Sequence, residues 1–258
     1  MVLYYSATGN TQFIAKQLAR RLEDEAVNLL PRIRKQDFSE LHSEKPFVIC
    51  APVHVCEPPR FLVAYLMATP LSGSPMVYFV FTSGGFAGIS SSVGKLIAKK
   101  KGMLYMGCKE LKMPRNYPLS KKYPMLSDKE NLERLRGAAK EIPGTADCIL
   151  CGRKMKGGRH VTFAEKLITM PFNPIWNKFR HSTKGFYTTD SCIGCGKCAG
   201  ICPLNRITME KGRPKWEGNC SHCMACLANC PFEAIEYKGR TERKPKYRIG
   251  KYLKRQYM

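Results

Sequence analysis

Two short cysteine-rich runs near the C-terminal end constrain this chain more than any other feature of its sequence. Both runs have the spacing C-x2-C-x2-C-x3-C followed by proline, with cysteines at Cys192, Cys195, Cys198 and Cys202 and at Cys220, Cys223, Cys226 and Cys230. Eight of the 13 cysteines lie in these runs, and an odd total fits a disulfide framework poorly. The runs therefore predict metal ligation in a reducing compartment.

This spacing resembles that of bacterial ferredoxins with two [4Fe-4S] clusters. Three thiolates within seven residues can surround one side of an iron–sulfur cube, whereas the fourth lies too far along the chain to close the same cluster. One cluster is predicted on Cys192, Cys195, Cys198 and Cys230, and the other on Cys220, Cys223, Cys226 and Cys202. The 17 residues between the runs are predicted to form a hairpin with its turn at Lys211-Gly212.

Structural zinc is the alternative for such cysteines. It generally uses two C-x-x-C pairs, separated by a loop, to form one tetrahedral site. Two consecutive four-cysteine runs that both end in Cys-Pro fit this arrangement poorly. The sequence therefore favours two clusters over zinc.

The first 110 residues alternate between short apolar runs and amphipathic stretches, a pattern typical of β-α units on a parallel sheet. Strands are predicted near Val2–Tyr5, Ala26–Leu29, Phe47–Ala51, Met76–Phe81 and Met103–Leu111. Helices are predicted at Thr11–Glu25, Pro59–Met67, Ser90–Lys101 and Asp128–Lys140, the last with Ser127 as its N-cap. The expected fold class is α/β, a doubly wound parallel sheet followed by a second, small α+β domain.

A polar loop follows the first predicted strand and opens the first helix. It consists of Ser6, Ala7, Thr8, Gly9, Asn10 and Thr11. Hydroxyl groups and successive main-chain N–H groups at a helix N-terminus can bind a phosphate without a cation. The same residues could form a simple N-cap, but their position after a first strand favours the phosphate site.

This loop resembles the S/T-x-T-G-x-T phosphate loop of the flavodoxin superfamily at every fixed position. The resemblance implies a flavodoxin-like fold with FMN at the carboxyl ends of the first, third and fourth strands. It implies further contacts from Pro52, Val53 and His54 and from Thr82, Ser83, Gly84, Gly85 and Phe86. His54 and Phe86 are the candidates for stacking on the isoalloxazine ring.

The chain as a whole is similar to the two-domain flavodoxin–ferredoxin fusions of anaerobic bacteria and archaea. The similarity extends to Met113-Pro114-Arg115-Asn116-Tyr117 and to a basic tail, but the N-terminal domain is basic whereas stand-alone flavodoxins are typically acidic. The expected organisation is a flavodoxin-like FMN-binding domain at 1–142, a connector at 143–187 with a short helix near Phe163–Met170, a 2[4Fe-4S] ferredoxin-like domain at 188–238 and a tail at 239–258. The tail is expected to lie on the surface or fray.

The net charge of +23 is concentrated toward the C-terminal end. The tail from Lys238 onward has nine basic residues and one acidic residue, and its expected role is to attract an acidic redox partner such as a ferredoxin or a reductase. Nucleic-acid binding ranks last because no reading module is recognisable. A homo-oligomer remains open. No apolar run reaches the roughly 18 residues of a membrane span, and no signal peptide is recognisable, so a cytoplasmic location is expected.

The combination of one flavin and two clusters predicts an electron-transfer protein that converts between one- and two-electron steps for a protein partner. No nicotinamide fingerprint and no acid, base or nucleophile constellation stands out, so catalytic residues are not assigned. The alternative is an FMN-dependent reductase of a quinone or porphyrin-like molecule, fed by the clusters. Cys148 and Cys151 form a C-x-x-C pair interpreted as incidental thiols.

Overall fold

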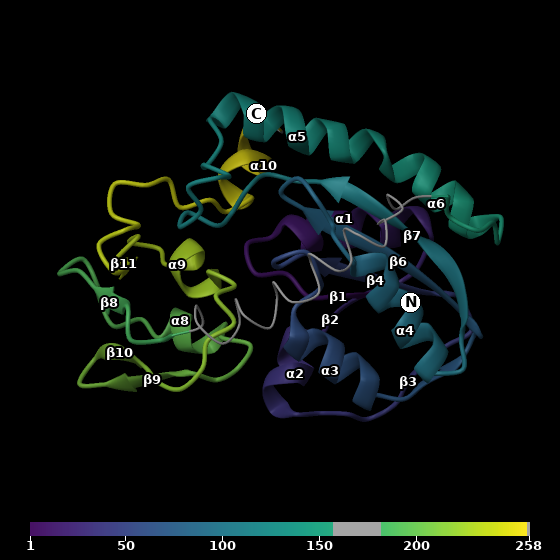
Figure 1. Ribbon diagram of the computed structural model, residues 1–258, viewed down its shortest axis with the longest axis horizontal. Coiled ribbons are helices and arrows are strands. Elements are labelled where there is room, and N and C mark those ends of the chain that lie inside the picture. The colour runs from purple at the N-terminus through teal and green to yellow at the C-terminus, as the bar shows by residue number, and fades with distance from the viewer. Residues whose placement is uncertain (157–181, 257–258) are drawn as a thin grey trace.

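The computed structural model describes residues 1–156 and 182–256, which form two lobes side by side (Figure 1). A larger α/β lobe contains the N-terminal elements, a smaller lobe contains both cysteine runs, and the C-terminal tail returns to the larger lobe. The predicted helix near Phe163–Met170, and with it most of the predicted connector, lies outside the described residues.

Short elements alternate along the larger lobe. Its strands are β1 (Val2–Tyr4), β2 (Ala26–Asn28), β3 (Leu41–Ser43), β4 (Phe47–Pro52), β5 (Leu71–Gly73), β6 (Met76–Ser83) and β7 (Leu104–Lys112). Its helices are α1 (Asn10–Arg21), α2 (Leu30–Lys35), α3 (Arg60–Ala68), α4 (Ser90–Lys100), α5 (Asp128–Lys140) and α6 (Ile142–Leu150). The five predicted strands and the four predicted helices are therefore present, although α1 ends at Arg21, before the predicted Glu25.

Five strands pair in parallel in the order β2-β1-β4-β6-β7. Counted in chain order within this sheet, the strands read 2-1-3-4-5, the order of the flavodoxin-like doubly wound fold. The predicted fold class of this lobe is confirmed. Strands β3 and β5 form a separate two-stranded sheet that the sequence analysis did not predict.

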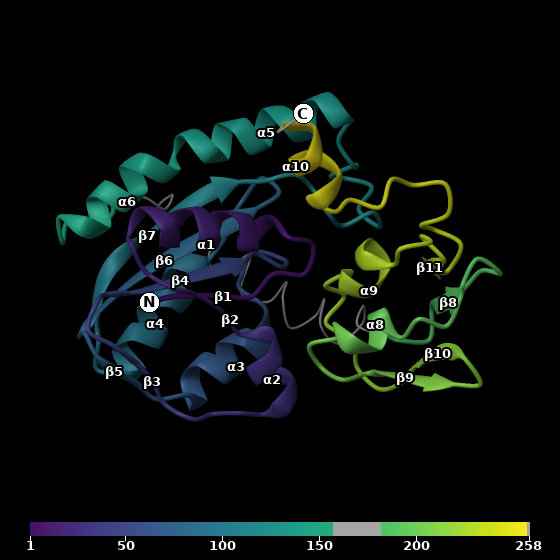
Figure 2. The same ribbon diagram turned by 180° about the vertical axis from the view of Figure 1, so that it is seen from behind.

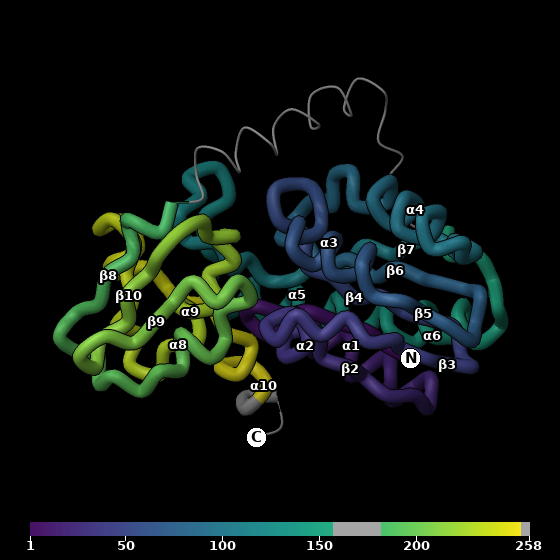
Figure 3. Tube along the Cα trace, turned by 90° about the horizontal axis from the view of Figure 1, so that it is seen from below, coloured from purple at the N-terminus to yellow at the C-terminus, as the bar shows by residue number. Residues whose placement is uncertain are grey.

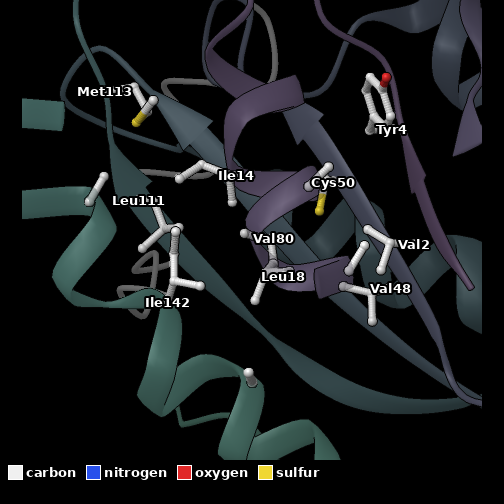
Figure 4. Close-up of a cluster of buried hydrophobic side chains, with 14 of the residues drawn as sticks. Val2, Tyr4, Ile14, Leu18, Val48, Cys50, Val80, Leu111, Met113 and Ile142 are labelled. Carbon is white, nitrogen blue, oxygen red and sulfur yellow. The ribbon is translucent and has the colours of Figure 1, made fainter. Parts of the chain in front are cut away.

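Alternate residues of the sheet enter two different cores because successive side chains of a strand point to opposite faces. Val2, Tyr4, Val48 and Val80 pack under α1, α5 and α6 (Figure 4). The residues between them pack under α3 and α4 on the other face, namely Leu3, Tyr5, Phe47, Ile49, Phe79 and Phe81. The sheet is therefore covered on both sides, as Figure 2 shows from behind.

Helix α6 corrects the expectation that a weak connector begins at residue 143. Ile142, Ala146 and Ile149 of this helix are buried in the core beside α1. Pro143 was interpreted as an interruption, but it lies in the first turn of the helix, where its missing N–H costs no hydrogen bond. The larger lobe thus continues through α6. Among the described residues, no helix is both long and apolar enough to cross a bilayer.

The smaller lobe is built from short antiparallel pairs around the cysteine runs. Its elements are β8 (Phe186–Thr188), α8 (Lys197–Gly200), β9 (Ile207–Glu210), β10 (Arg213–Trp216), α9 (Ala225–Asn229) and β11 (Ile235–Tyr237). β9 pairs with β10 through a turn at Lys211-Gly212, as predicted, and β8 pairs with β11. Both turn residues have positive φ, which suits a two-residue hairpin. Ser182 already pairs with Asn219, ahead of the predicted start at residue 188.

The C-terminal tail is part of the fold, which corrects the expectation that it lies loosely on the surface. Tyr247, Ile249 and Tyr252 are buried in the core of the larger lobe, and α10 (Gly250–Gln256) lies beside α5 (Figures 1 and 2). Tyr252 Oη donates to Asp128 Oδ1 at 2.7 Å and accepts from Asn131 Nδ2 at 3.0 Å. The apolar residues spaced among the basic ones hold this segment in place.

We expect Ile249→Ala to lower the free energy of unfolding by about 2–4 kcal/mol, since it removes buried methyl groups and leaves a cavity. Lys251→Ala, two residues further along in the first turn of α10, is the matched control. Lys251 loses only an exposed ion pair with Glu233, worth less than about 1 kcal/mol. Thermal and denaturant unfolding of both variants measures the difference. Equal, small effects would show that the tail is not packed as described.

Candidate functional site

Four cysteines from both runs line a cavity at the outer side of the smaller lobe. Cys192, Cys195, Cys198 and Cys230 surround a space of about 340 Å³. Cys195 is exposed, and two apolar side chains on the same wall, Ile193 and Phe232, are 63% and 52% exposed. This cavity, called here the outer cavity, therefore opens toward solvent.

The other four cysteines line a second cavity, called here the inner cavity. Cys202, Cys220, Cys223 and Cys226 surround a space of about 370 Å³ with Trp216 and Ala225 on its wall. Cys223 and Ala225 also pack against the apolar core of the larger lobe, beside Tyr5 and Phe81. The inner cavity thus faces the larger lobe. Figure 3 shows the two lobes side by side, seen from below. Each cavity combines three cysteines of one run with the last cysteine of the other.

The two runs follow the same backbone path with different residues. In the first run Gly194 and Gly196 adopt positive φ, and at the equivalent positions of the second run His222 and Met224 do so. A positive φ is strained for a residue with a side chain, by about 1–3 kcal/mol. The His222 ring is buried and bonds Ser182 O at 3.2 Å and Tyr117 Oη at 3.4 Å. These contacts hold the strained turn, so His222 has a hydrogen-bonding role beside the cysteines.

Main-chain N–H groups already point at several cysteine sulfurs. Arg206 N donates to Cys202 Sγ at 3.3 Å, and Ala234 N donates to Cys230 Sγ at 3.4 Å, each four residues after its cysteine. His222 N donates to Cys220 Sγ at 3.3 Å. Such bonds stabilise thiolates and cluster-bound sulfur. Together with the two cavities, these donors fit iron–sulfur clusters.

When no metal is bound, burial is the main effect on the pKa values of three inner thiols, and it favours their protonated form. It raises the pKa of Cys220 to about 12 and raises those of Cys223 and Cys226 as well. A metal-bound thiol is deprotonated, so loading the inner cavity must release protons. Within the described residues, no three His, Cys, Asp or Glu side chains converge as ligands of a single ion.

The predicted phosphate loop lies at the N-terminus of α1, where Gly9 has φ 97°. Its hydroxyl groups have partners within the protein, since Thr8 Oγ1 accepts from Asn116 Nδ2 at 2.9 Å and Thr11 Oγ1 bonds Thr82 Oγ1 at 2.8 Å. Ser6 Oγ accepts from Gly9 N at 3.1 Å. The structure thus places Ser6, Thr8 and Thr11 around the turn but buries the last two.

The tail contacts the same loop from its outer side. Ile249 N donates to Thr8 O at 3.1 Å, and Tyr247 Oη donates to Asn10 Oδ1 at 2.6 Å. A Cβ atom at Gly9 would overlap the Ile249 side chain. Asn10 also donates to Pro114 O at 2.9 Å, so its side chain fixes the loop rather than pointing to a ligand.

The two other predicted loops are braced against each other at the carboxyl end of the sheet. Val53 N donates to Thr82 O at 2.9 Å, and Ile89 N donates to Cys56 O at 2.8 Å. Val55 and Cys56 form a turn with φ of 50° and 69°, an unfavourable conformation for a β-branched residue. The structure therefore brings together the two segments predicted to flank the flavin, with Pro52, Val53 and His54 on one and Ser83, Gly84, Gly85 and Phe86 on the other. Which ring would stack on the flavin stays a prediction.

A pair of arginines gives this end of the sheet a positive charge. Arg115 Nε is buried without a hydrogen-bond partner among the described residues, and its side chain lies beside Gly84. Arg134 donates to Gly84 O at 2.7 Å, and burial together with the Arg115 charge lowers the pKa of its guanidinium. An unpaired buried donor beside an open glycine loop fits an anionic nucleotide such as FMN.

The phosphate loop also contacts the smaller lobe. Asn229 Nδ2, one residue before Cys230, donates to Ala7 O at 2.8 Å. Arg34 donates to Ala199 O at 2.7 Å, and Asn205 donates to Arg34 O at 2.8 Å. The inner cavity and the candidate flavin loops therefore lie on adjoining surfaces of one packed interface.

Sequence reasoning missed several residues that shape these sites. Arg115 and Asn116 lie within a segment noted for its family resemblance, but that segment suggested no role for either. Tyr5 fitted the apolar alternation of the first strand, and Trp216 fell within a predicted hairpin. No local pattern distinguishes such residues, because each acquires its role from a distant segment. Cys148 is half-buried and Cys151 exposed, and neither lines a cavity described above.

Sequence comparisons identify the smaller lobe. Residues 182–235 match the 4Fe-4S dicluster domain family. A ferredoxin from Pyrobaculum islandicum is 38% identical over 72 residues, which cover 25% of this chain and 66% of the ferredoxin. A putative electron transport protein, YccM, from Escherichia coli is 45% identical over 42 residues, which cover 16% of this chain and 12% of that protein.

Structural comparisons find resemblances over the larger lobe. A putative flavoprotein from Bacteroides eggerthii has a TM-score of 0.37 and 18% identity, covering 58% of this chain and 96% of that one. A short-chain flavodoxin associated with a non-canonical PDU bacterial microcompartment has a TM-score of 0.32 and 20% identity. The match covers 56% of this chain and 96% of that one. The Megasphaera elsdenii flavodoxin has a TM-score of 0.32 and 13% identity. The match covers 55% of this chain and 99% of that one.

We expect Gly88→Ala to separate the two braced loops. Gly88 has φ 56°, and a Cβ there would overlap Cys56 Cβ and O. The expected loss of unfolding free energy is more than about 2 kcal/mol, from the left-handed conformation and the overlap together. Gly85→Ala is the control, because a Cβ at Gly85 meets nothing within 4 Å. Unchanged stability of Gly88→Ala in denaturant unfolding would contradict the close contact.

Proposed function

We propose that this chain, which joins a flavodoxin-like domain to a ferredoxin-like 4Fe-4S domain, is an electron-transfer protein that holds FMN and two [4Fe-4S] clusters. When bound, the clusters supply one-electron carriers and FMN supplies a two-electron carrier. The protein's own residues hold these groups, shield them and set their surroundings.

The observation that carries this proposal is the contact between the inner cavity and the phosphate loop. Cys223 and Ala225 pack on the core beside Tyr5, and two residues after Tyr5 the loop accepts a hydrogen bond from Asn229. The proposal is supported by this interface, because the four inner cysteines lie next to the loop proposed to hold FMN. Adjacent mounting of two redox groups is what transfer of electrons within one chain requires.

The cysteines have the following proposed roles. Cys192, Cys195, Cys198 and Cys230 hold the outer cluster, and Cys202, Cys220, Cys223 and Cys226 hold the inner one. This assignment is supported by the two cavities, each of which mixes both runs. The inner set is proposed to be the better shielded one, because Cys226 is buried and Cys223 packs against the core of the larger lobe.

For FMN, the proposed binding residues are the loop Ser6–Thr11 and the two braced loops after β4 and β6. Because Thr8 and Thr11 are buried and already bonded, we infer that phosphate is held mainly by main-chain N–H groups at the start of α1, with Ser6. The Arg115 guanidinium orients the anionic part of the nucleotide through its unpaired Nε. Gly84 and Gly85 leave space for close approach of the ring, while His54 and Phe86 are the stacking candidates.

An external redox protein is the proposed partner, and the outer cavity is its proposed approach side because Ile193 and Phe232 are exposed there. The basic net charge favours an acidic partner such as a ferredoxin or a reductase. The tail itself is not a free steering arm. Lys246 is buried in an ion pair with Glu236 at 2.5 Å, and Lys244 donates to Pro118 O at 2.9 Å. Removing the tail would therefore disturb the fold, contrary to the sequence-based expectation.

The cluster assignment is tested by alanine variants of four cysteines. Anaerobically prepared protein is expected to hold about eight iron and eight sulfide per chain. Cys202→Ala and Cys220→Ala are expected to lose the same cluster signal in electron paramagnetic resonance, and Cys230→Ala and Cys192→Ala the other. Cys148→Ala, outside both cavities, is the control with full iron content. The crossed assignment fails if Cys202→Ala removes the signal that Cys192→Ala removes.

The flavin site is tested by Arg115→Met. Loss of a hydrogen bond from a charged group costs about 1.5–3 kcal/mol, so FMN affinity should fall by about ten- to a hundredfold. Lys121→Met removes an exposed charge from the same segment and should leave affinity unchanged. Fluorescence titration of the flavin-free protein with FMN gives both values. Release of FAD rather than FMN from purified protein would contradict the site model.

A further inference from the structure

Tyr5 directly follows β1 and is wholly buried between the two lobes. Its ring meets Phe61 edge-on, with centroids 4.9 Å apart and an interplanar angle of 89°. Its hydroxyl group is buried and has no hydrogen-bond partner among the described residues. A buried polar group left in this condition is destabilising, because it has lost its bonds to water without replacing them. A ligand that accepts this proton would remove that cost.

The polar neighbours of the Tyr5 hydroxyl are cysteines of the inner cavity. Cys223 has the strongest electrostatic interaction with this hydroxyl, followed by Cys202 and Cys220. These are three of the four residues proposed to hold the inner cluster. The hydroxyl comes from the flavodoxin-like domain, whereas all its sulfur neighbours come from the ferredoxin-like domain.

Trp216 contributes a second donor of the same kind. Its Nε1 is buried without a hydrogen-bond partner in the described residues and lies beside the Cys226 sulfur. The indole is held by stacking on Phe186, with centroids 5.5 Å apart and an interplanar angle of 16°. Two unpaired buried donors, one from each lobe, therefore face the same set of four sulfurs.

The other unpaired buried side-chain atoms in the described chain lie elsewhere, on Thr69, Arg115 and Asn131. None of these residues lines the outer cavity, whose wall instead carries exposed apolar side chains. The surroundings of the two cysteine sets thus differ in hydrogen-bond donors as well as in exposure.

We propose that Tyr5 Oη and Trp216 Nε1 donate hydrogen bonds to sulfurs of the inner cluster and raise its reduction potential. The inference rests on the proposed function, since it needs a cluster at Cys202, Cys220, Cys223 and Cys226. Reduction adds negative charge to the cluster, and donors directed at its sulfurs stabilise that charge. Because Tyr5 belongs to the other domain, the potential depends on how the two domains are seated.

The test is a redox titration of full-length, anaerobically loaded protein, followed by electron paramagnetic resonance. Tyr5→Phe removes only the hydroxyl group, and Trp216→Phe removes the N–H while keeping an aromatic ring against Phe186. Tyr4→Phe is the matched control, because Tyr4 points to the opposite face of the same strand, where its hydroxyl accepts from Gln12 Nε2 at 3.3 Å (Figure 4). Iron content and thermal midpoint are measured for each variant.

We expect Tyr5→Phe and Trp216→Phe each to move the same one of the two cluster potentials to a more negative value and to leave the other in place. Tyr4→Phe should move neither. If Tyr5→Phe lowers iron content, Trp216→Phe alone decides the outcome by the same criterion.

Unchanged potentials in a variant that keeps its full iron content would overturn this inference and leave the proposed function standing. So would an equal shift in Tyr4→Phe. A protein that binds no cluster at the four inner cysteines would overturn both. The two failures are therefore distinguished by iron analysis before any potential is measured.

Discussion

The seating of the second cysteine run on the apolar face of the sheet is the contact on which the rest of this molecule depends. Ala225 is buried in the same core as Tyr5 and Phe81, so the smaller lobe shares a core with the larger one rather than hanging from a linker. Burial of apolar surface is the main favourable term in such contacts. It fixes the inner cavity at the carboxyl end of β1, where the phosphate loop begins.

Because of this contact, the two cysteine runs have different surroundings although their spacing is the same. Both runs have the same cysteine spacing, and both place a positive-φ residue in the same two positions of the turn. The first uses glycines and opens to solvent, whereas the second uses His222 and Met224 and is enclosed. The cost of the second turn is offset by hydrogen bonds of the His222 ring and by its edge contacts with Phe186 and Tyr237. Environment rather than ligand type therefore distinguishes the two sites.

Local patterns predicted the periodic part of the fold well. The five parallel strands, Ser127 as the N-cap of α5, and the turn at Lys211-Gly212 all follow from alternation, helical spacing or turn chemistry. The predicted start of the connector was wrong because its signal is ambiguous over short range. Pro143 can break a helix or begin one, and only burial of the following residues on α1 decides between these outcomes.

The candidate site shows the same division between local and distant information. Motifs identified the cysteines and the phosphate loop, but partners such as Asn116 for Thr8 and Tyr247 for Asn10 lie more than 100 and 200 residues away in sequence. Nothing in the basic tail marked Ile249 as a contact of Gly9, because Gly9 lies in a segment far away in sequence. Such pairings follow only from the tertiary fold.

The strap formed by Tyr247, Ile249 and Tyr252 has a consequence for the order in which the molecule can be completed. The loop at Thr8–Asn10 is synthesised before both cysteine runs, whereas Tyr247 and Ile249, which also bond to it, are synthesised after them. During synthesis the sheet can therefore form before the predicted phosphate loop has all of its contacts. The loop therefore gains its last contacts only after both cysteine runs have been synthesised.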